Sequence, residues 1–247
     1  ARNCHKAVYH ALYLRELQPV YIYPHEDQRL GINGGISPER VERYLEENTD
    51  VQAFLLTSPT YDGVVSDIKT IAEVVHRHKI PLIVDEAHGA HLHYSKYFPV
   101  SAADLGADIV IQSFHKTLPS MTQTAVLHIC SDMADVEKIK RFMGIYQTSS
   151  PSYILMASMD ACMDKLRKDG QQMFREFTFN LEKARQRLSK CEKIKLIEGS
   201  MIEGSGIYDF DRSKLLFSTV GISVNGRLLH QILRDRYHIE MEMAAEK

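Results

Sequence analysis

A short apolar run that ends in a lysine-bearing turn most constrains the fold of this chain. Residues 107–120 read ADIVIQSFHKTLPS, with three β-branched residues in a row before the serine. Such residues favour strands, and Pro119 prevents regular structure from continuing. The pattern therefore predicts a strand over Asp108 to Ser113, followed by a turn that carries Lys116. Because Phe114 and Leu118 flank the lysine, we expect a desolvated and nucleophilic amine.

A second strand upstream ends in a carboxylate. Residues 81–91 read PLIVDEAHGAH, in which Leu82 to Val84 form a short buried strand and Asp85 follows directly. Because parallel strands end at one edge of an open α/β sheet, Asp85 and Lys116 are expected to meet there. Pyridoxal phosphate needs both groups: a lysine holds its aldehyde, and a carboxylate keeps its ring nitrogen protonated. The pair therefore indicates a pyridoxal phosphate site.

The N-terminal two thirds of the sequence alternates between strand and helix patterns. This rhythm predicts a mostly parallel sheet sandwiched by helices. The expected strands are Pro19–Tyr23, Val51–Thr57 and Thr124–Ile129, and the expected helices begin at Pro38, span Ser66–His78 and begin after an Asp132 cap. The last of these helices is predicted to bury Met133, Val136, Ile139 and Met143.

The C-terminal third shows architectural patterns. A polar loop, Tyr146 to Tyr153, precedes a helix over Ile154–Leu166 and a second, longer helix with an aromatic stripe at Phe174 and Phe177. Strands are expected at Ile194–Ile197 and Leu215–Val220, and Asn225 is predicted to cap a final helix.

Composition argues against several classes of protein. The net charge of the 247 residues is −2, with both signs distributed along the chain, so no nucleic-acid partner is expected. No apolar run approaches the roughly 20 residues that span a membrane. The four cysteines are scattered without a CxxC pair, which is typical of reduced thiols and predicts a cytoplasmic location.

The main alternative to a cofactor site is zinc. His88, His91 and His93 lie close together in HGAHLH. Catalytic zinc usually has three protein ligands, often at a spacing fixed by a helix, whereas a glycine interrupts this set and no cysteine completes it. We therefore expect no metal.

Four segments in order carry a specific family resemblance. They are RNCHKAVYHAL (2–12), LTSPTYDGVVSDI (56–68), PLIVDEAHGAH (81–91) and SFHKTLPSMTQTAVLH (113–128). Together they resemble the major domain of the bacterial Orn/Lys/Arg decarboxylases, which are fold-type-I pyridoxal phosphate enzymes. The resemblance covers residues 1–168 well. It implies a major domain over 1–168, lacking its N-terminal part, and a connecting helix with the start of a smaller C-terminal α/β domain over 169–247.

The resemblance also implies roles for individual residues. It makes Lys116 the lysine that binds the cofactor and Asp85 the partner of the ring nitrogen. It places His5 on one face of the ring and His88 at the ring or its phenolic oxygen. Ser113 and His115 would hold the phosphate, and Thr148 and Ser149 would approach the phosphate of a neighbouring subunit, which requires a homodimer or larger homo-oligomer. From the residues alone, His5 also suits a helix cap, and residues 146–153 also suit a simple interhelical loop.

The activity implied is decarboxylation of arginine, lysine or ornithine to an amine and carbon dioxide. An acyltransferase of the α-oxoamine synthase type also shows the DEAH pattern and stays open. So does a catalytically silent fragment or assembly partner. Full family members carry a phosphate-gripping loop before RNCHK and continue beyond position 247, so the sequence is expected to be part of a longer protein.

Overall fold

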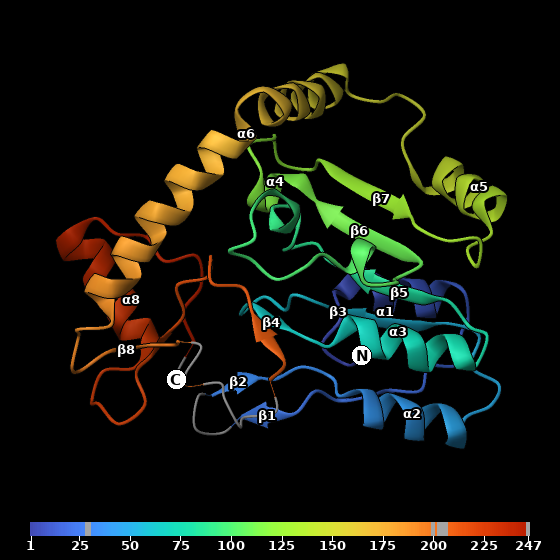
Figure 1. The fold of residues 1–247 in the computed structure, drawn as a ribbon, viewed down its shortest axis with the longest axis horizontal. Coiled ribbons are helices and arrows are strands. Elements are labelled where there is room, and N and C mark those ends of the chain that lie inside the picture. The colour runs from blue at the N-terminus through green and yellow to red at the C-terminus, as the bar shows by residue number, and fades with distance from the viewer. Residues whose placement is uncertain (28–30, 199–200, 202–206, 246–247) are drawn as a thin grey trace.

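A four-stranded sheet lies at the centre of the computed structural model, which describes residues 1–27, 31–198, 201 and 207–245. The strands occur in the order β3 (Phe54–Thr57), β5 (Leu82–Asp85), β6 (Ile109–Ser113) and β7 (Ala125–Ile129) (Figure 1). β3 and β6 both run parallel to β5, whereas β7 pairs with β6 antiparallel. The predicted α/β class with a mostly parallel sheet is confirmed.

Two helices pack on one face of this sheet. α2 (Pro38–Glu47) begins after Ser37, whose hydroxyl accepts a hydrogen bond from Arg40 N, and α3 (Ile68–Arg77) begins after Asp67 in the same way. Alternate strand residues are buried, as expected for side chains that point to opposite faces. The buried core joins both helices to the strands and includes Val41, Leu45, Leu56, Ile71, Val75, Leu82, Val84 and Val110.

Short elements surround the sheet. The helical ones are α1 (Lys6–Leu14), η1 (Leu92–Tyr94), η2 (Ala102–Asp104), α4 (Phe114–Thr117), α5 (Val136–Tyr146) and α8 (Gly226–Tyr237). The strand pairs are β1 (Glu26–Asp27) with β2 (Ile32–Asn33), β4 (Val64–Val65) with β9 (Asp209–Phe210), and β8 (Lys195–Leu196) with β10 (Phe217–Ser218). Because β4 directly follows the loop after β3, the β4–β9 pair ties the sheet domain to the C-terminal part.

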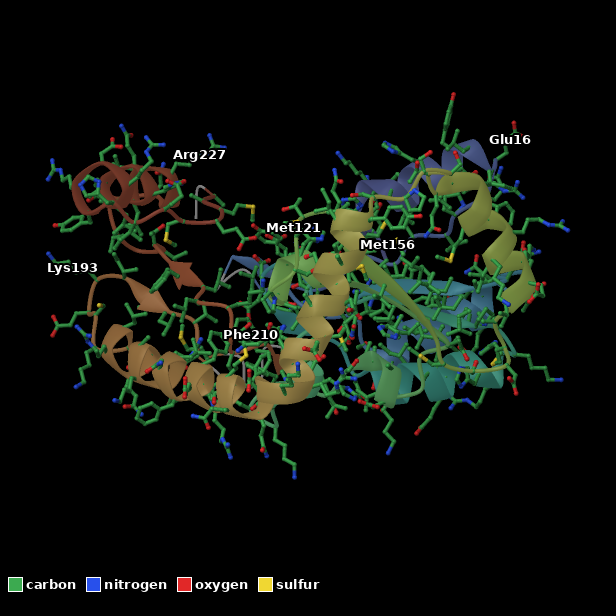
Figure 2. The ribbon with its side chains drawn as sticks, turned by 90° about the horizontal axis from the view of Figure 1, so that it is seen from above. Glu16, Met121, Met156, Lys193, Phe210 and Arg227 are labelled. Atoms are coloured by element: carbon green, nitrogen blue, oxygen red, sulfur yellow. The ribbon has the colours of Figure 1, made fainter. Side chains whose placement is uncertain are left out.

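One continuous helix replaces the two that the sequence predicts. α6 (Tyr153–Leu188) runs for 36 residues and begins at the Ser152 cap. The polar stretch around Gly170 looks like a break, but charged pairs one turn apart, such as Lys165 with Asp169, support helix there. Figure 2 shows Met156 beside Met121 at one end of α6 and Lys193 beyond its other end; Met121 N also donates to Ser158 on α6.

The predicted domain boundary at residue 168 lies inside α6, so it stays a prediction. Residues 199–200, 202–206 and 246–247 of the predicted second domain lie outside the described residues.

Three local predictions were wrong. Residues 19–23 form no strand, because no strand among the described residues pairs with this β-prone segment. α5 is capped by Asp135, which accepts from Lys138 N, and not by Asp132. No residue of α5 is fully buried: of the residues predicted to be buried, Ile139 and Met143 are half-buried, and Met133 and Val136 are exposed. The strands predicted at 51–57, 194–197 and 215–220 exist but are shorter.

No helix among the described residues combines the length and apolarity needed to cross a lipid bilayer.

The buried carboxylate of Glu86 fixes the chain where it leaves β5. Only 1% of Glu86 is exposed, and its carboxylate accepts hydrogen bonds from the Ser101 hydroxyl at 2.7 Å, Ala102 N at 2.7 Å and Gln112 Nε2 at 2.6 Å. Burial raises the pKa of Glu86, and these donors oppose the rise. Gly89 is needed beside it, since a Cβ there would lie 2.5 Å from Glu86 Cγ.

Replacing Glu86 by alanine should lower the free energy of unfolding by about 3–5 kcal/mol, because three buried donors lose their acceptor. Urea denaturation measures this change. Glu46→Ala, at an exposed position of α2, is the matched control and should stay within about 0.5 kcal/mol of the parent. A loss below about 1 kcal/mol for Glu86→Ala would contradict this role.

Candidate active site

The strand register places Asp85 at the carboxyl edge of the sheet. Thr57, Asp85 and Ile111 are register partners on adjacent strands, so their side chains share one face. Ser113 lies two residues beyond Ile111 and therefore shares that face as well. Asp85 Oδ1 accepts from Ala87 N at 3.2 Å, and the buried hydroxyl of Thr57 has no hydrogen-bond partner among the described residues.

Lys116 lies one helical turn beyond the end of β6. α4 begins at Phe114, immediately after the strand, and carries Lys116 to within 3.2 Å of His88, measured from Nζ to Nε2. The expected desolvation was wrong, because Lys116 is an exposed residue. The apolar neighbours Phe114 and Leu118 are buried in the core instead of covering the amine.

The space that Lys116 faces is a cavity of about 680 Å³. Its polar wall includes Asp62, Lys214 and Glu242, and its apolar wall includes Leu166, Phe174 and Phe177. These residues come from the loop after β3, from α6 and from the C-terminal segment. The cavity therefore lies where the sheet domain meets the C-terminal part.

His88 lies buried between two lysines. Its Nε2 faces Lys116, and its Nδ1 lies 3.4 Å from Lys214 Nζ. Burial is the main cause that lowers the pKa of His88 to about 3, and the charge of Lys214 adds to it. The imidazole is therefore neutral at pH 7. The Tyr61 ring meets it edge-on, with ring centroids 5.1 Å apart.

His91 anchors the same loop to the C-terminal part. His91 Nε2 lies 3.3 Å from the Asp211 carboxylate, and both side chains are almost fully buried. Burial alone would raise the pKa of Asp211, but the His91 contact and two hydrogen bonds from Ser213 lower it overall. The loop after β5 is thereby held against the segment that carries Lys214.

The two predicted phosphate contacts lie beside Lys116. Ser113 ends β6, and its hydroxyl makes no hydrogen bond with any described residue. His115 Nδ1 donates to the Thr124 carbonyl at 2.9 Å, which leaves Nε2 for another partner.

The structure does not bring His5, Thr148 or Ser149 into this group. His5 is exposed and caps α1, where its Nδ1 accepts from Ala7 N. Thr148 and Ser149 are exposed in the connection between α5 and α6, and the Thr148 hydroxyl bonds only with Ser150 among the described residues (Figure 1). The proposed roles of all three stay predictions.

The three histidines considered for zinc have different partners. His88 faces the two lysines, His91 faces Asp211, and His93 pairs with Asp104 at 3.1 Å on the surface. No group of three or more His, Cys, Asp or Glu side chains in the described part of the chain is placed to hold a metal ion.

Sequence reasoning missed several residues of this site. Asp62, Lys214 and Glu242 line the cavity, Tyr61 packs on His88, and Asp211 holds His91. Tyr61 and Asp62 lie in the SPTYDG loop, whose position at the sheet edge was a usable signal. No local sequence pattern identifies Asp211, Lys214 and Glu242, because only the tertiary fold brings these residues near Lys116.

Comparisons with known proteins agree with this geometry. The family model described as "Orn/Lys/Arg decarboxylase, major domain" matches residues 1–227. The arginine decarboxylase of Bacillus subtilis is 33% identical over 243 residues, which are 98% of this chain and 50% of that protein. The constitutive lysine decarboxylase of Escherichia coli is 28% identical over 181 residues, or 67% of this chain and 25% of that protein.

Solved structures support the fold. The lysine decarboxylase of Francisella novicida superposes with a TM-score of 0.74 at 22% identity, over 99% of this chain and 40% of that one. The chain spans about half the length of the arginine decarboxylases that it matches. From the match over residues 1–227, the chain belongs to the Orn/Lys/Arg decarboxylase family.

Proposed function

We propose that the full-length protein decarboxylates a basic amino acid with pyridoxal phosphate as its cofactor. The observation that carries this proposal is that two neighbouring parallel strands end at the same sheet edge, close in sequence to Asp85 and Lys116. Asp85 ends β5, and Lys116 follows β6, the strand that pairs with β5 in parallel. Membership of the Orn/Lys/Arg decarboxylase family supports the same chemistry.

The residues at this edge fit the cofactor. Lys116 Nζ would hold it covalently, Asp85 would face its ring nitrogen, and Ser113 and His115 Nε2 are free to meet its phosphate. The buried hydroxyls of Thr57 and Thr117 lack partners among the described residues, as expected where polar atoms await a bound group. When bound, pyridoxal phosphate accepts the electron pair released as the bond between Cα and the carboxylate breaks.

The cavity also suits a substrate with an apolar stem and a distal cation. Burial raises the pKa of Asp62, while Lys214 opposes the rise; burial and the neighbouring Glu242 carboxylate raise the pKa of Tyr61. The apolar wall from α6 would pack against the alkyl chain. We infer that Asp62 and Glu242 bind the distal ammonium or guanidinium.

Asp85 has the clearest role in the chemical step. Its carboxylate would stabilise the protonated ring nitrogen of the bound cofactor, and a preorganised charge of this kind acts most strongly where water is excluded. Lys116 would hold the cofactor through Nζ, at the position where the substrate amine must arrive. The neutral His88 beside Lys116 can form a hydrogen bond with the lysine amine through Nε2.

The active protein is proposed to be a cytoplasmic homodimer or larger homo-oligomer that contributes to polyamine metabolism. α1 and α5 have no buried residue, yet they expose Tyr13, Leu14, Ile145 and Tyr146. Apolar surface of this kind marks interfaces, and a second copy would also give Thr148 and Ser149 a site to approach. All four cysteines are free thiols, which supports a reducing compartment.

The full-length protein supplied with pyridoxal phosphate should release carbon dioxide from at least one of arginine, lysine and ornithine. Carbon dioxide and amine products are measured for each. Lys116→Ala should abolish release, whereas exposed Lys190→Ala should not alter it. Norleucine, which lacks the distal cation, should not react. Turnover by Lys116→Ala, or norleucine turnover equal to that of lysine, would refute the proposal.

Asp85→Ala should lower turnover by roughly two to four orders of magnitude, because loss of a buried partner costs about 3–5 kcal/mol. Steady-state kinetics of the full-length protein measure this loss. Asp132→Ala, at an exposed position, serves as the control. Turnover of Asp85→Ala within tenfold of the parent would reject the assignment.

Sedimentation equilibrium of the full-length protein should give at least twice the mass of one chain. Ile145→Lys with Tyr146→Lys should shift the equilibrium toward the monomer, because charges replace exposed apolar side chains. Lys138→Glu with Lys140→Glu, on the same helix, keeps the apolar residues and controls for surface charge. A monomeric parent would contradict the homodimer.

A further inference from the structure

A hydrogen-bonding conflict surrounds His88. One lysine nitrogen lies 3.2 Å from Nε2, and another lies 3.4 Å from Nδ1. A neutral imidazole has one N–H donor and one acceptor nitrogen, and an ammonium group only donates. His88 can therefore accept from one ammonium alone. Its other nitrogen carries a proton and needs an amine lone pair opposite it.

The surroundings indicate which lysine donates a hydrogen bond to His88. Lys214 is the lysine whose charge acts on a carboxylate, since it opposes the rise in the pKa of Asp62. Lys214 Nζ also lies over the Tyr61 ring, 5.9 Å from its centroid, which is a position that suits a cation. The groups that face His88 are Lys116 and His115 from α4, Lys214 and Asp211 from the segment after β9, and Tyr61 from the loop after β3. Two lysine nitrogens thus face a buried ring whose two nitrogens cannot both accept a hydrogen bond.

Lys214 is also held firmly in place. Its carbonyl accepts from Arg185 Nη1 at 3.0 Å, and its own N–H donates to the Asp211 carbonyl at 3.1 Å. Arg185 is buried on α6 and also donates to the carbonyls of Ile197 and Arg212. Gly63 leaves room for the side chain, because a Cβ there would lie 2.9 Å from Lys214 Cγ.

We propose that Lys214 is a positioning residue that acts on Lys116 through His88. Lys214 donates to Nδ1 and thereby keeps the ring proton on Nε2, where it faces the Lys116 amine. The lone pair of Lys116 then accepts this N–H, so Lys116 stays a nucleophilic amine. The inference rests on the proposed function, in which Lys116 is the residue that binds the cofactor.

The nucleophilicity of Lys116 without cofactor tests this inference. The cofactor-free full-length protein is treated with trace acetic anhydride from pH 6 to 10. Peptide mass spectrometry then gives the rate of acetylation at Lys116 relative to that at Lys190. Lys214→Met should lower the relative rate at pH 7 roughly tenfold, because the ring proton of His88 is then no longer held on Nε2, where the Lys116 lone pair accepts it. Lys214→Arg, which retains the charge, should stay within about threefold of the parent, well short of that loss.

Two results would overturn the inference. One is a relative rate for Lys214→Met within twofold of the parent; the other is an equal loss in Lys214→Arg. Nitrogen NMR of His88 in the parent protein needs no variant: a proton on Nε2 supports the inference, and a proton on Nδ1 refutes it. Neither measurement needs cofactor or turnover. Failure of decarboxylation and failure of this inference are therefore distinguishable.

Discussion

The site depends on the buried carboxylate of Glu86. A carboxylate without water needs several donors, and Glu86 finds them in β6 through Gln112 and in η2 through Ala102. These hydrogen bonds fix the direction of the chain after β5. Asp85 consequently stays on one face of the sheet, while His88 and His91 follow in the loop toward the cavity.

The C-terminal part completes the cavity through a small set of buried polar contacts. His91 meets Asp211, and Arg185 donates to three carbonyls of the same region. The β4–β9 pair adds backbone hydrogen bonds, and Phe210 of β9 is buried between the sheet domain and the C-terminal part (Figure 2). Breaking one of these contacts would leave buried groups unpaired. These contacts therefore fix the position of the C-terminal part relative to the sheet domain.

Local rules predicted much of the framework. Ser37 and Asp67 cap their helices, and the apolar runs before Asp85 and Lys116 form the predicted parallel strands. The same rules failed where secondary structure depends on contacts with distant parts of the chain. Residues 19–23 have strand composition without a pairing strand, and Gly170 does not interrupt α6 because neighbouring charged pairs and packing against Tyr94 support the helix.

The sequence by itself determined the strand that ends at Asp85 and the strand that precedes Lys116, because strand patterns and helix caps are local. Only the tertiary structure decided that Lys116 is exposed to a cavity and that His88 lies between two lysines. Lys214 and Asp211 reach this site through long-range packing of α6 and β9 against the sheet domain. The reason is physical: the protonation of a buried ring depends on charges brought near it in space, and the spacing of residues along a chain does not specify those distances.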